Sequence, residues 1–432
     1  MLKSIKYVLT SFALVLSVLP LFADGGAHNA YSPYSKFGIG RLNDMGTAYN
    51  RTMGGTGTAT RDNKYVNIMN PASVTARDSL SFMMDFSLAQ NNVYFAQNDL
   101  RSVNNTFNIE NFSISFPIYK SSAMMLGITP FSSVGYDFSG IVEDKDVIGH
   151  TGNIADLYSG SGSLYQVYVS GAVTFWKRLS VGGEFDFYFG KLEKNYSRTF
   201  EVSNYRSLYE GNSMSITGFG GKIGLQYEET IAKKHKITLG GTYRIKTDLK
   251  GHQEDIKYAL QSEVTDTVTI RNTNISGVNI PQEFSVGLSY RYSTKFRAEV
   301  DYTRSDWKSS GMDAVNGFRT GAFTSSVSQK VNAGFEYTPN RNDIRYYMRR
   351  VSYRVGAYYG DDYYCFNGNK ISSYGLTLGM TLPVFRWYNG ITVGMDIGQR
   401  GSLKNDLVRE RYIGFSVGFN IFDVWFVKPK YE

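Results

Sequence analysis

The chain has 432 residues, a formal charge of +8 at pH 7, a slightly polar mean hydropathy, 33 tyrosines, 28 phenylalanines and one cysteine. A single cysteine excludes an intrachain disulfide framework, and the basic residues are scattered rather than clustered, so no nucleic-acid partner is expected. After residue 23 no stretch approaches 18 apolar residues, and the sequence therefore predicts no membrane-spanning helix.

Residues 1–23 have the pattern of a secretory signal peptide. Lys3 and Lys6 precede a short apolar run, and Ala23 supplies the small residue that cleavage requires. The run is too short and too often interrupted by polar residues for a membrane anchor, and no cysteine follows it to carry a lipid. Cleavage would leave a chain that begins at Asp24 and carries a charge of +6, because the two lysines leave with the peptide.

Residues 24–73 precede the first predicted strand and are rich in glycine and small side chains. A phosphate-binding loop is one interpretation, but that site needs a strand before the glycines and a helix after them, and neither is evident. A flexible linker is also disfavoured, because Tyr65 and Ile68 would give it apolar anchors. The residues of interest are Gly54, Gly55, Gly57, Asn70, Pro71 and Ala72.

From residue 79 onward, apolar residues alternate with small or polar ones, which is the pattern of β-strands with two different faces. About fourteen such segments occur, each roughly ten residues long, as a tilted membrane-spanning strand requires. The predicted strands are 79–89, 107–118, 122–134, 164–176, 179–190, 213–228, 234–246, 282–292, 296–306, 326–338, 351–360, 371–383, 390–399 and 408–422.

Short and long connections alternate between these strands, and only 339–350 blurs the pattern. Outer-membrane barrels have tight periplasmic turns and long extracellular loops, whereas a soluble β-sandwich has no reason to place every long loop at one end. Aromatic residues near strand ends, such as Trp176 and Trp387, fit the girdles at a membrane interface. We therefore predict an all-β fold, an antiparallel transmembrane barrel of about 14 strands over residues 74–432. The predicted long loops are 90–106, 135–163, 191–212, 247–281 and 307–325.

A fourteen-stranded barrel is too wide for wall side chains alone to fill, so its lumen must hold water or a plug. Residues 24–73 are long enough to provide a plug, and their glycines would allow close packing and positive φ angles. Pro71 would fix an extended entry into the first strand. The sequence thus predicts an N-terminal plug, or hatch, inside the barrel.

The stretch "GTAYNRTMGGTGTATRDNKYVNIMNPAS" (46–73) resembles the hatch of the FadL-type outer-membrane transporters of long-chain fatty acids and other hydrophobic compounds. The hatch of that family is rich in Gly and Ala and ends in Asn-Pro-Ala just before the first strand. Residues 31–40 and the C-terminal 425–432 are similar to a divergent branch. In that branch, some members are similar to accessory subunits of outer-membrane secretion or assembly machines. The resemblance implies passive uptake of a fatty-acid-like ligand past the hatch, in the outer membrane of a Gram-negative cell.

The sequence offers no catalytic or cofactor chemistry. The four histidines lack metal-binding spacing, and no nucleophile elbow can be placed, so neither an enzyme nor a cofactor is expected. A Ser–His lipase assembled from separate strands would use His235, but spacing gives it no support.

Charged residues on the polar strand faces would be costly against lipid, so they should point into the lumen. They either hold the hatch in place or form a gate that opens as substrate passes. The predicted polar contacts involve Arg51, Arg61, Asp62, Asp85, Glu184 and Asp186, and Asp301 and Asp396 also lie on or near polar strand faces.

Two functions remain open on the sequence alone. The first is uptake of a hydrophobic small molecule, for which Pro130 could produce a kink or a gap in the barrel wall. The second is a non-transporting subunit of an outer-membrane complex, for which long loops and the Tyr- and Arg-rich segment 341–350 are the signals. The expected partners are outer-membrane lipid, a hydrophobic ligand and, in the second case, other outer-membrane proteins.

Overall fold

The computed structural model describes residues 30–78, 80–141, 148, 152–202, 204–261, 264–314, 323–384 and 389–424. The predicted signal peptide (1–23), residues 24–29 and the C-terminal 425–432 lie outside the described residues, as does Trp387.

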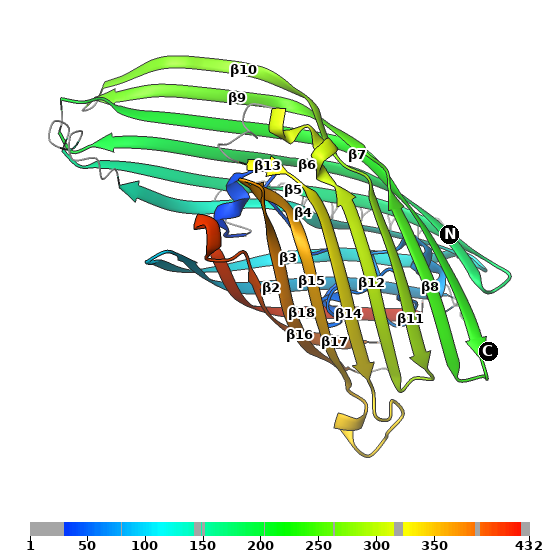
Figure 1. The fold of residues 1–432 in the computed structure, drawn as a ribbon. Coiled ribbons are helices and arrows are strands. Elements are labelled where there is room, and N and C mark those ends of the chain that lie inside the picture. Colours follow the sequence, from blue (N-terminus) through cyan, green and yellow to red (C-terminus); the bar gives the residue numbers. More distant parts are fainter. Residues whose placement is uncertain are drawn as a thin grey trace, which may run out of the picture.

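Long antiparallel strands form the wall, and each pairs with its neighbours along the chain (Figure 1). The ring is closed by the last and first wall strands, which pair from Arg409↔Ala96 to Val424↔Ser81. The strands are β2 (Ser81–Gln97), β3 (Leu100–Tyr119), β4 (Ser122–Ile141), β5 (Ile154–Phe175), β6 (Leu179–Phe200), β7 (Ser207–Ile231), β8 (His235–Arg244), β9 (Thr247–Gln261), β10 (Val264–Ile280), β11 (Glu283–Tyr292), β12 (Phe296–Asp306), β13 (Phe323–Ser325), β14 (Val327–Tyr337), β15 (Ser352–Phe366), β16 (Asn369–Pro383), β17 (Gly390–Arg400) and β18 (Arg409–Val424).

Three wall strands are each interrupted once and carry two labels: β8 with β9, β10 with β11, and β13 with β14. For example, β7 pairs with β8 over Lys222–Ile231 and with β9 over Ser207–Gly218. Over the described residues the wall therefore has 14 strands, and the prediction of a closed 14-stranded antiparallel barrel is confirmed.

The two faces of the wall differ as the alternation predicts. In β6, Phe185 points outward and is exposed, whereas Glu184 and Asp186 point inward and are buried. In the neighbouring β7, Phe219 and Leu225 are exposed on the same outer face. Exposed apolar side chains recur on the outer face of nearly every wall strand, which is the surface that a barrel presents to lipid.

Several strands are much longer than predicted, and four of the five predicted long loops are wrong in large part. Residues 90–106, 191–212 and 247–281 are mostly strand, and β4 and β5 take up 135–141 and 154–163. The 25 residues of β7 correspond to about 80 Å of extended chain. Figure 1 shows β5, β6, β7, β9 and β10 curving together beyond the other strands. The exposed face of β9 and β10 is largely polar, with residues such as Lys250, Glu254 and Arg271, so it lacks the regular apolar residues that give the period-two signal elsewhere. We call this end the long-strand end and the opposite end the short-turn end.

The N-terminal segment, residues 30–78, packs against inward-facing groups of the wall; Figure 1 shows it in blue among the strands. It contains little regular structure, and none of the helices in the described part of the chain is long and apolar enough to cross a membrane. Its elements are η2 (Pro33–Lys36), β1 (Arg41–Leu42), α2 (Ala48–Thr52) and η3 (Pro71–Ala76). The remaining short helices, η4 (Trp307–Ser310), η5 (Met312–Ala314), η6 (Tyr347–Arg349) and η7 (Lys404–Asp406), lie between strands.

Candidate functional site: the barrel interior and the β3–β4 gap

Glycines allow the N-terminal segment to touch the wall backbone directly. Gly54 has a φ of +70°, and a Cβ there would meet the backbone of Ala333 in β14 and Ala357 in β15. On the wall side, a Cβ on Gly356 would collide with the backbone of Gly54. Only glycine fits at both positions, so the segment and the wall are complementary at the level of the main chain.

Asn70 joins two parts of the segment to each other. Its Nδ2 donates to the Thr58 carbonyl at 2.7 Å, and its Oδ1 accepts from the Ala72 amide at 3.0 Å. Pro71 then begins η3, and its backbone covers Gly182 of β6 so closely that a side chain there would clash. The Asn-Pro-Ala motif therefore fixes the last turn of the segment against the wall.

This close packing predicts a difference between inward and outward glycines. We expect Gly356→Val to lower the free energy of unfolding by about 3 kcal/mol, because the new side chain must displace the segment. Gly183→Val is the matched control, since a Cβ at Gly183 meets nothing within 4 Å. Guanidinium unfolding of the two variants in lipid vesicles measures the difference, and equal stabilities would show that the segment does not press on the wall.

Two acidic residues of β12 hold the glycine-rich turn of the segment. The Asp301 Oδ2 accepts from the amides of Gly57 and Thr58, at 2.7 and 2.8 Å. The Glu299 Oε2 accepts from the Thr60 hydroxyl at 2.6 Å. Charged acceptors make stronger hydrogen bonds to N–H groups than neutral ones, so this turn is firmly attached.

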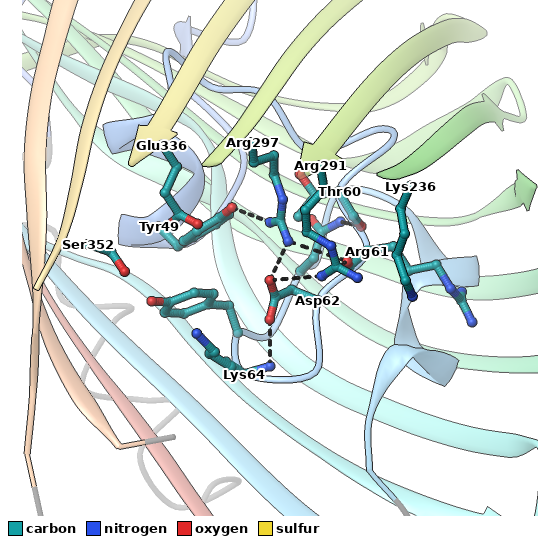
Figure 2. A network of polar contacts seen from close by, with 12 residues as sticks. Tyr49, Thr60, Arg61, Asp62, Lys64, Lys236, Arg291, Arg297, Glu336 and Ser352 are labelled. Atoms are coloured by element: carbon teal, nitrogen blue, oxygen red, sulfur yellow. Dashed lines mark hydrogen bonds and ion pairs between the residues drawn. The ribbon is translucent and has the colours of Figure 1, made fainter. Parts of the chain in front are cut away.

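Asp62 is the centre of a buried ion network near the short-turn end (Figure 2). It pairs with Arg297 of β12, and Arg291 of β11 approaches the same carboxylate oxygen at 3.5 Å. Burial alone would raise the pKa of Asp62, but the charge of Arg297 and its neighbours outweighs burial and lowers that pKa below its ordinary value. Asp62 is therefore ionised at neutral pH, and it compensates wall arginines that would otherwise be buried alone.

A second ion pair lies beside this network. The Arg354 Nε donates to Glu336 at 2.7 Å, and its Nη2 donates to the Tyr65 hydroxyl at 3.0 Å. The Arg354 guanidinium also lies 4.4 Å from the centre of the Tyr49 ring, which stacks on Tyr65. Aromatic and charged groups together thus bind the segment to β14 and β15.

The interior of the long-strand end is apolar and aromatic instead. Trp307 and Tyr363 are fully buried there, with ring centres 4.8 Å apart, and both belong to one large cluster. The cluster comprises Tyr34, Ile39, Phe131, Val134, Tyr136, Leu164, Tyr188, Leu192, Met214, Ile216, Leu249, Ile275, Val278, Ile280, Trp307, Met312, Phe323, Tyr363, Tyr364 and Ile371. The lumen is therefore divided into a charged zone and an apolar zone along the barrel axis.

The wall opens between β3 and β4. Their pairing starts at the turn, with Tyr119↔Ser122, and ends at Phe112↔Ile128, although both strands continue. Pro130 follows two residues later, and the pairing of β4 with β5 is irregular at the same place. Proline cannot donate to a strand pair, which explains why the ladder stops here. We call the unpaired stretch, toward the long-strand end, the β3–β4 gap.

Residues 31–43, which we call the edge segment, cover the freed edge of β4. The Asn43 amide donates to the Phe131 carbonyl at 2.9 Å, and the Ser32 amide donates to the Gly135 carbonyl at 2.8 Å. Between them, β1 pairs with β4 through Arg41↔Ser133 and Leu42↔Ser132. The chain's own N-terminal part thus takes the place that β3 leaves empty.

Beyond β4, the edge segment is also attached to residues at β18 and β15. The Tyr34 hydroxyl donates to the Val408 carbonyl at 2.5 Å, and the Ser32 hydroxyl donates to the buried Glu410. The Tyr363 hydroxyl donates to the Gly40 carbonyl at 2.6 Å. Residues 31–43 therefore reach from β4 to β18 and β15 at the long-strand end.

A cavity of about 220 Å³ lies beside the N-terminal segment and is lined by residues from strands around much of the wall. Charged and polar side chains line much of it, including Arg51, Lys330 and Asp396. The described residues contain no group of three or more His, Cys, Asp or Glu side chains that could hold a metal. His235 lies at a short turn, where its Nδ1 is 2.6 Å from the Tyr290 hydroxyl.

The sequence model of the BamG family matches residues 1–432, which is the whole chain. The chain belongs to the BamG family. No curated protein is significantly similar to it in sequence.

Solved structures similar to this BamG-family chain share its fold at low identity. A FadL homologue of Pseudomonas aeruginosa has 10% identity and a TM-score of 0.60 over 89% of this chain and 99% of that one. The toluene transporter TbuX of Ralstonia pickettii has 15% identity and a TM-score of 0.58, over 87% and 97%. The monoaromatic hydrocarbon channel CymD has 14% identity and a TM-score of 0.56, over 87% and 97%. The resemblance to FadL-type transporters, in a divergent branch, is confirmed.

Three of the predicted polar residues belong to the segment, and each contacts the wall of this BamG-family barrel. Arg51 pairs with Glu110 of β3 at 2.5 Å, Arg61 donates to Gln226 of β7 at 3.5 Å, and Asp62 lies at the centre of the network above. These contacts come from three sides of the barrel, so the segment is held around its circumference.

The three predicted wall residues Asp85, Glu184 and Asp186 point inward and are buried, but they do not pair with Arg51, Arg61 or Asp62. Each of them contacts a donor on an adjacent strand instead. Their partners are Asn111 at 3.0 Å for Asp85, Lys222 at 2.7 Å for Glu184 and Gln166 at 2.8 Å for Asp186.

Of the main charged partners of the segment in this BamG-family chain, Asp301 was named from the sequence, whereas Arg297, Glu299, Arg354 and Glu336 were not. Arg297 follows a recognisable signal, because Arg297, Glu299 and Asp301 occupy alternate positions on the inward face of a single strand. Three charges on one strand face indicate a polar contact inside the barrel. Arg354 and Glu336 gave no comparable signal, since each is an isolated charge among aromatic and small residues.

Proposed function

We propose that the chain is an outer-membrane barrel for passive uptake of hydrophobic, fatty-acid-like molecules past an N-terminal plug. In this proposal residues 1–23 are a cleaved signal peptide, 24–73 are the plug and 74–432 are the barrel. The short-turn end faces the periplasm and the long-strand end faces outward. The apolar outer face, which carries side chains such as Phe185 and Phe219, contacts membrane lipid.

The β3–β4 gap is the observation that carries this proposal. An unbroken wall would force every solute past the ion network around Asp62, which is a poor route for an apolar molecule. In this proposal the gap becomes a route from the apolar zone of the lumen to the outside of the wall, where the acyl chains of the membrane would lie. A molecule could leave sideways once residues 31–43 move from the edge of β4.

The apolar zone supplies the affinity for such a molecule. Aromatic and aliphatic side chains such as Phe131 and Val134 lie next to the gap and are buried. Displacing water from apolar surface yields roughly 25 cal/mol per Å², which is enough to draw a hydrophobic ligand inward without another energy source. The names of the similar structures, two of which are a toluene transporter and a monoaromatic hydrocarbon channel, agree with this ligand class.

The decisive test fixes the edge segment to β4 with a disulfide. Arg41→Cys and Ser133→Cys are introduced in a Cys365→Ser background, which removes the native thiol. Antiparallel Cα partners lie about 4.5–5.5 Å apart, which is within disulfide range. We expect uptake of radiolabelled oleate to fall to the level of cells that lack the protein, and to return when dithiothreitol reduces the bond.

A second disulfide serves as the control. Leu288→Cys and Val300→Cys join β11 to β12 on the outer face, far from the gap. This bond should leave oleate uptake unchanged under oxidising conditions. Full uptake with the 41–133 bond in place would exclude the gap as the route.

A second function is supported by a different observation. The ion pairs of Asp62 and Arg354, together with the hydrogen bonds of Asp301, attach the plug firmly, as expected for a barrel that never opens. Such a barrel would be a non-transporting subunit of an outer-membrane secretion or assembly complex. Gentle extraction followed by native mass spectrometry separates the two functions: a monomer with a bound lipophilic molecule supports uptake, and a ligand-free barrel in a defined complex supports the subunit.

A further inference from the structure

The connection between β14 and β15, residues 338–351, differs from its neighbours at the short-turn end. The turns between β5 and β6, β7 and β8, and β11 and β12 each have three residues, which is all that an antiparallel pair requires. The 338–351 loop has 14, and Figure 1 shows it projecting beyond the barrel rim. The additional residues do not serve wall closure, so a separate role must account for them. We call this connection the arginine loop.

The arginine loop has a defined conformation. The Asp343 carboxylate accepts from the amides of Arg345 and Tyr346 at 2.9 and 2.7 Å, and it also pairs with Arg349. These bonds, led by that from the Tyr346 amide, lower the pKa of Asp343 below its ordinary value. The Asn340 amide closes the base of the loop by donating to the Arg349 carbonyl at 2.8 Å. A surface that is already ordered loses little conformational freedom when it binds a partner.

The exposed face of this loop combines apolar and aromatic side chains with arginines. Ile344 at the tip is 96% exposed and Met348 is 58% exposed, although both are apolar. Arg345 and Arg349 lie against the Tyr346 ring, at 5.4 and 4.8 Å from its centre. Tyrosine and arginine are the residue types that contribute most to protein–protein binding energy.

The net charge of the loop indicates what kind of partner would bind to it. Four arginines, at 341, 345, 349 and 350, stand against one aspartate, whose carboxylate is occupied within the loop. At the base of the loop Lys64, Arg341 and Arg350 line a small cavity of about 20 Å³ whose lining contains no acidic residue. Burial, with a contribution from Arg341, lowers the pKa of Lys64 to about 8. The arginine loop, with four arginines and one aspartate, therefore carries a net positive charge.

We propose that the arginine loop is a docking site for a periplasmic protein, which presents an acidic segment with an apolar residue to Ile344 and the arginines beside it. The proposal rests on the orientation given under the proposed function, with the short-turn end in the periplasm. Electrostatic complementarity would set the specificity and the association rate, and burial of Ile344 and Met348 would slow dissociation. An anionic lipid surface is the competing source of negative charge.

In-cell photocross-linking from Ile344 tests the docking site. Full-length chains carry p-benzoylphenylalanine at position 344, or at Trp176 as the matched control. Trp176 is 83% exposed, belongs to a three-residue turn at the same end and is followed by Lys177 and Arg178. We expect position 344 to give one discrete protein adduct whose attached peptide is acidic, and position 176 to give none.

Charge variants complete the experiment. Arg345→Glu should reduce the adduct about tenfold, whereas Arg345→Lys should retain it. Adducts with lipid alone, equal adducts from Trp176, no adduct, or an adduct that Arg345→Glu leaves unchanged would each overturn the docking site. Oleate uptake is measured in the same cells and should not depend on Arg345, so a failure of the transport proposal is seen separately.

Discussion

Replacing Asp62 by asparagine should lower the free energy of unfolding by about 3–5 kcal/mol, which is the usual cost of leaving one partner of a buried ion pair without the other. Asparagine has the shape of aspartate and keeps the acceptor for the Lys64 amide, which the Asp62 Oδ1 accepts at 3.0 Å. What is lost is the negative charge between Arg297 and Arg291. The barrel should remain assembled while the N-terminal segment loosens at the short-turn end.

Guanidinium unfolding in lipid vesicles measures the stability, and limited proteolysis of residues 30–78 measures the loosening. A double variant, Asp62→Asn with Arg297→Met, removes both charges of the pair. Because these side chains are in contact, we expect it to be more stable than the sum of the single effects by about 2 kcal/mol. The Arg297→Met single variant is also measured, because it completes the double-mutant cycle.

A small effect of Asp62→Asn would contradict the structural role of this network. If stability fell by less than about 1 kcal/mol, as for an exposed ion pair, the network would be solvated and the N-terminal segment would be held elsewhere. If the double variant were simply additive, Asp62 and Arg297 would act independently of each other.

The wall of the barrel could be predicted from the sequence because its two faces meet different solvents. Phe185 and Phe219 are exposed on the outer face while Glu184 and Asp186 are buried on the inner face, and this contrast produces the period of two. Beyond the apolar belt the contrast ends, so the long hairpin of β9 and β10 was mistaken for a loop. Local sequence therefore identifies only strands whose faces differ.

Much of the interior could not be predicted, because its contacts join residues that are far apart in the chain. The Asn-Pro-Ala motif is continuous, so a resemblance could identify it. By contrast, Asp62 meets Arg297 across 235 residues and Ser32 meets Glu410 across 378. A single sequence carries no signal for such pairs; it shows only that each charge lies on a face that must avoid lipid.

Removing the edge segment should open the β3–β4 gap without opening the rest of the lumen. In a chain whose mature part begins at Asp44, β4 loses its bonds at Phe131 and Gly135, and the apolar zone loses the fully buried Ile39. Each lost hydrogen bond costs about 0.5–1.5 kcal/mol, and the wall, closed by the pairing of β18 with β2, should survive. Oleate uptake should rise above that of the intact chain, because nothing then covers the route.

Ion conductance separates this variant from Asp62→Asn. Residues 46–78 remain attached through Asp62 and Asp301, so the shortened chain should conduct no more ions in a planar bilayer than the intact one. Asp62→Asn should show the opposite pattern, with conductance raised and the gap still covered by residues 31–43. Heat-modifiable migration on gels confirms that both barrels are folded. The shortened, folded barrel could instead take up oleate no faster than the intact chain. The edge segment would then only complete the wall at β4, and the barrel would function as a subunit rather than a transporter.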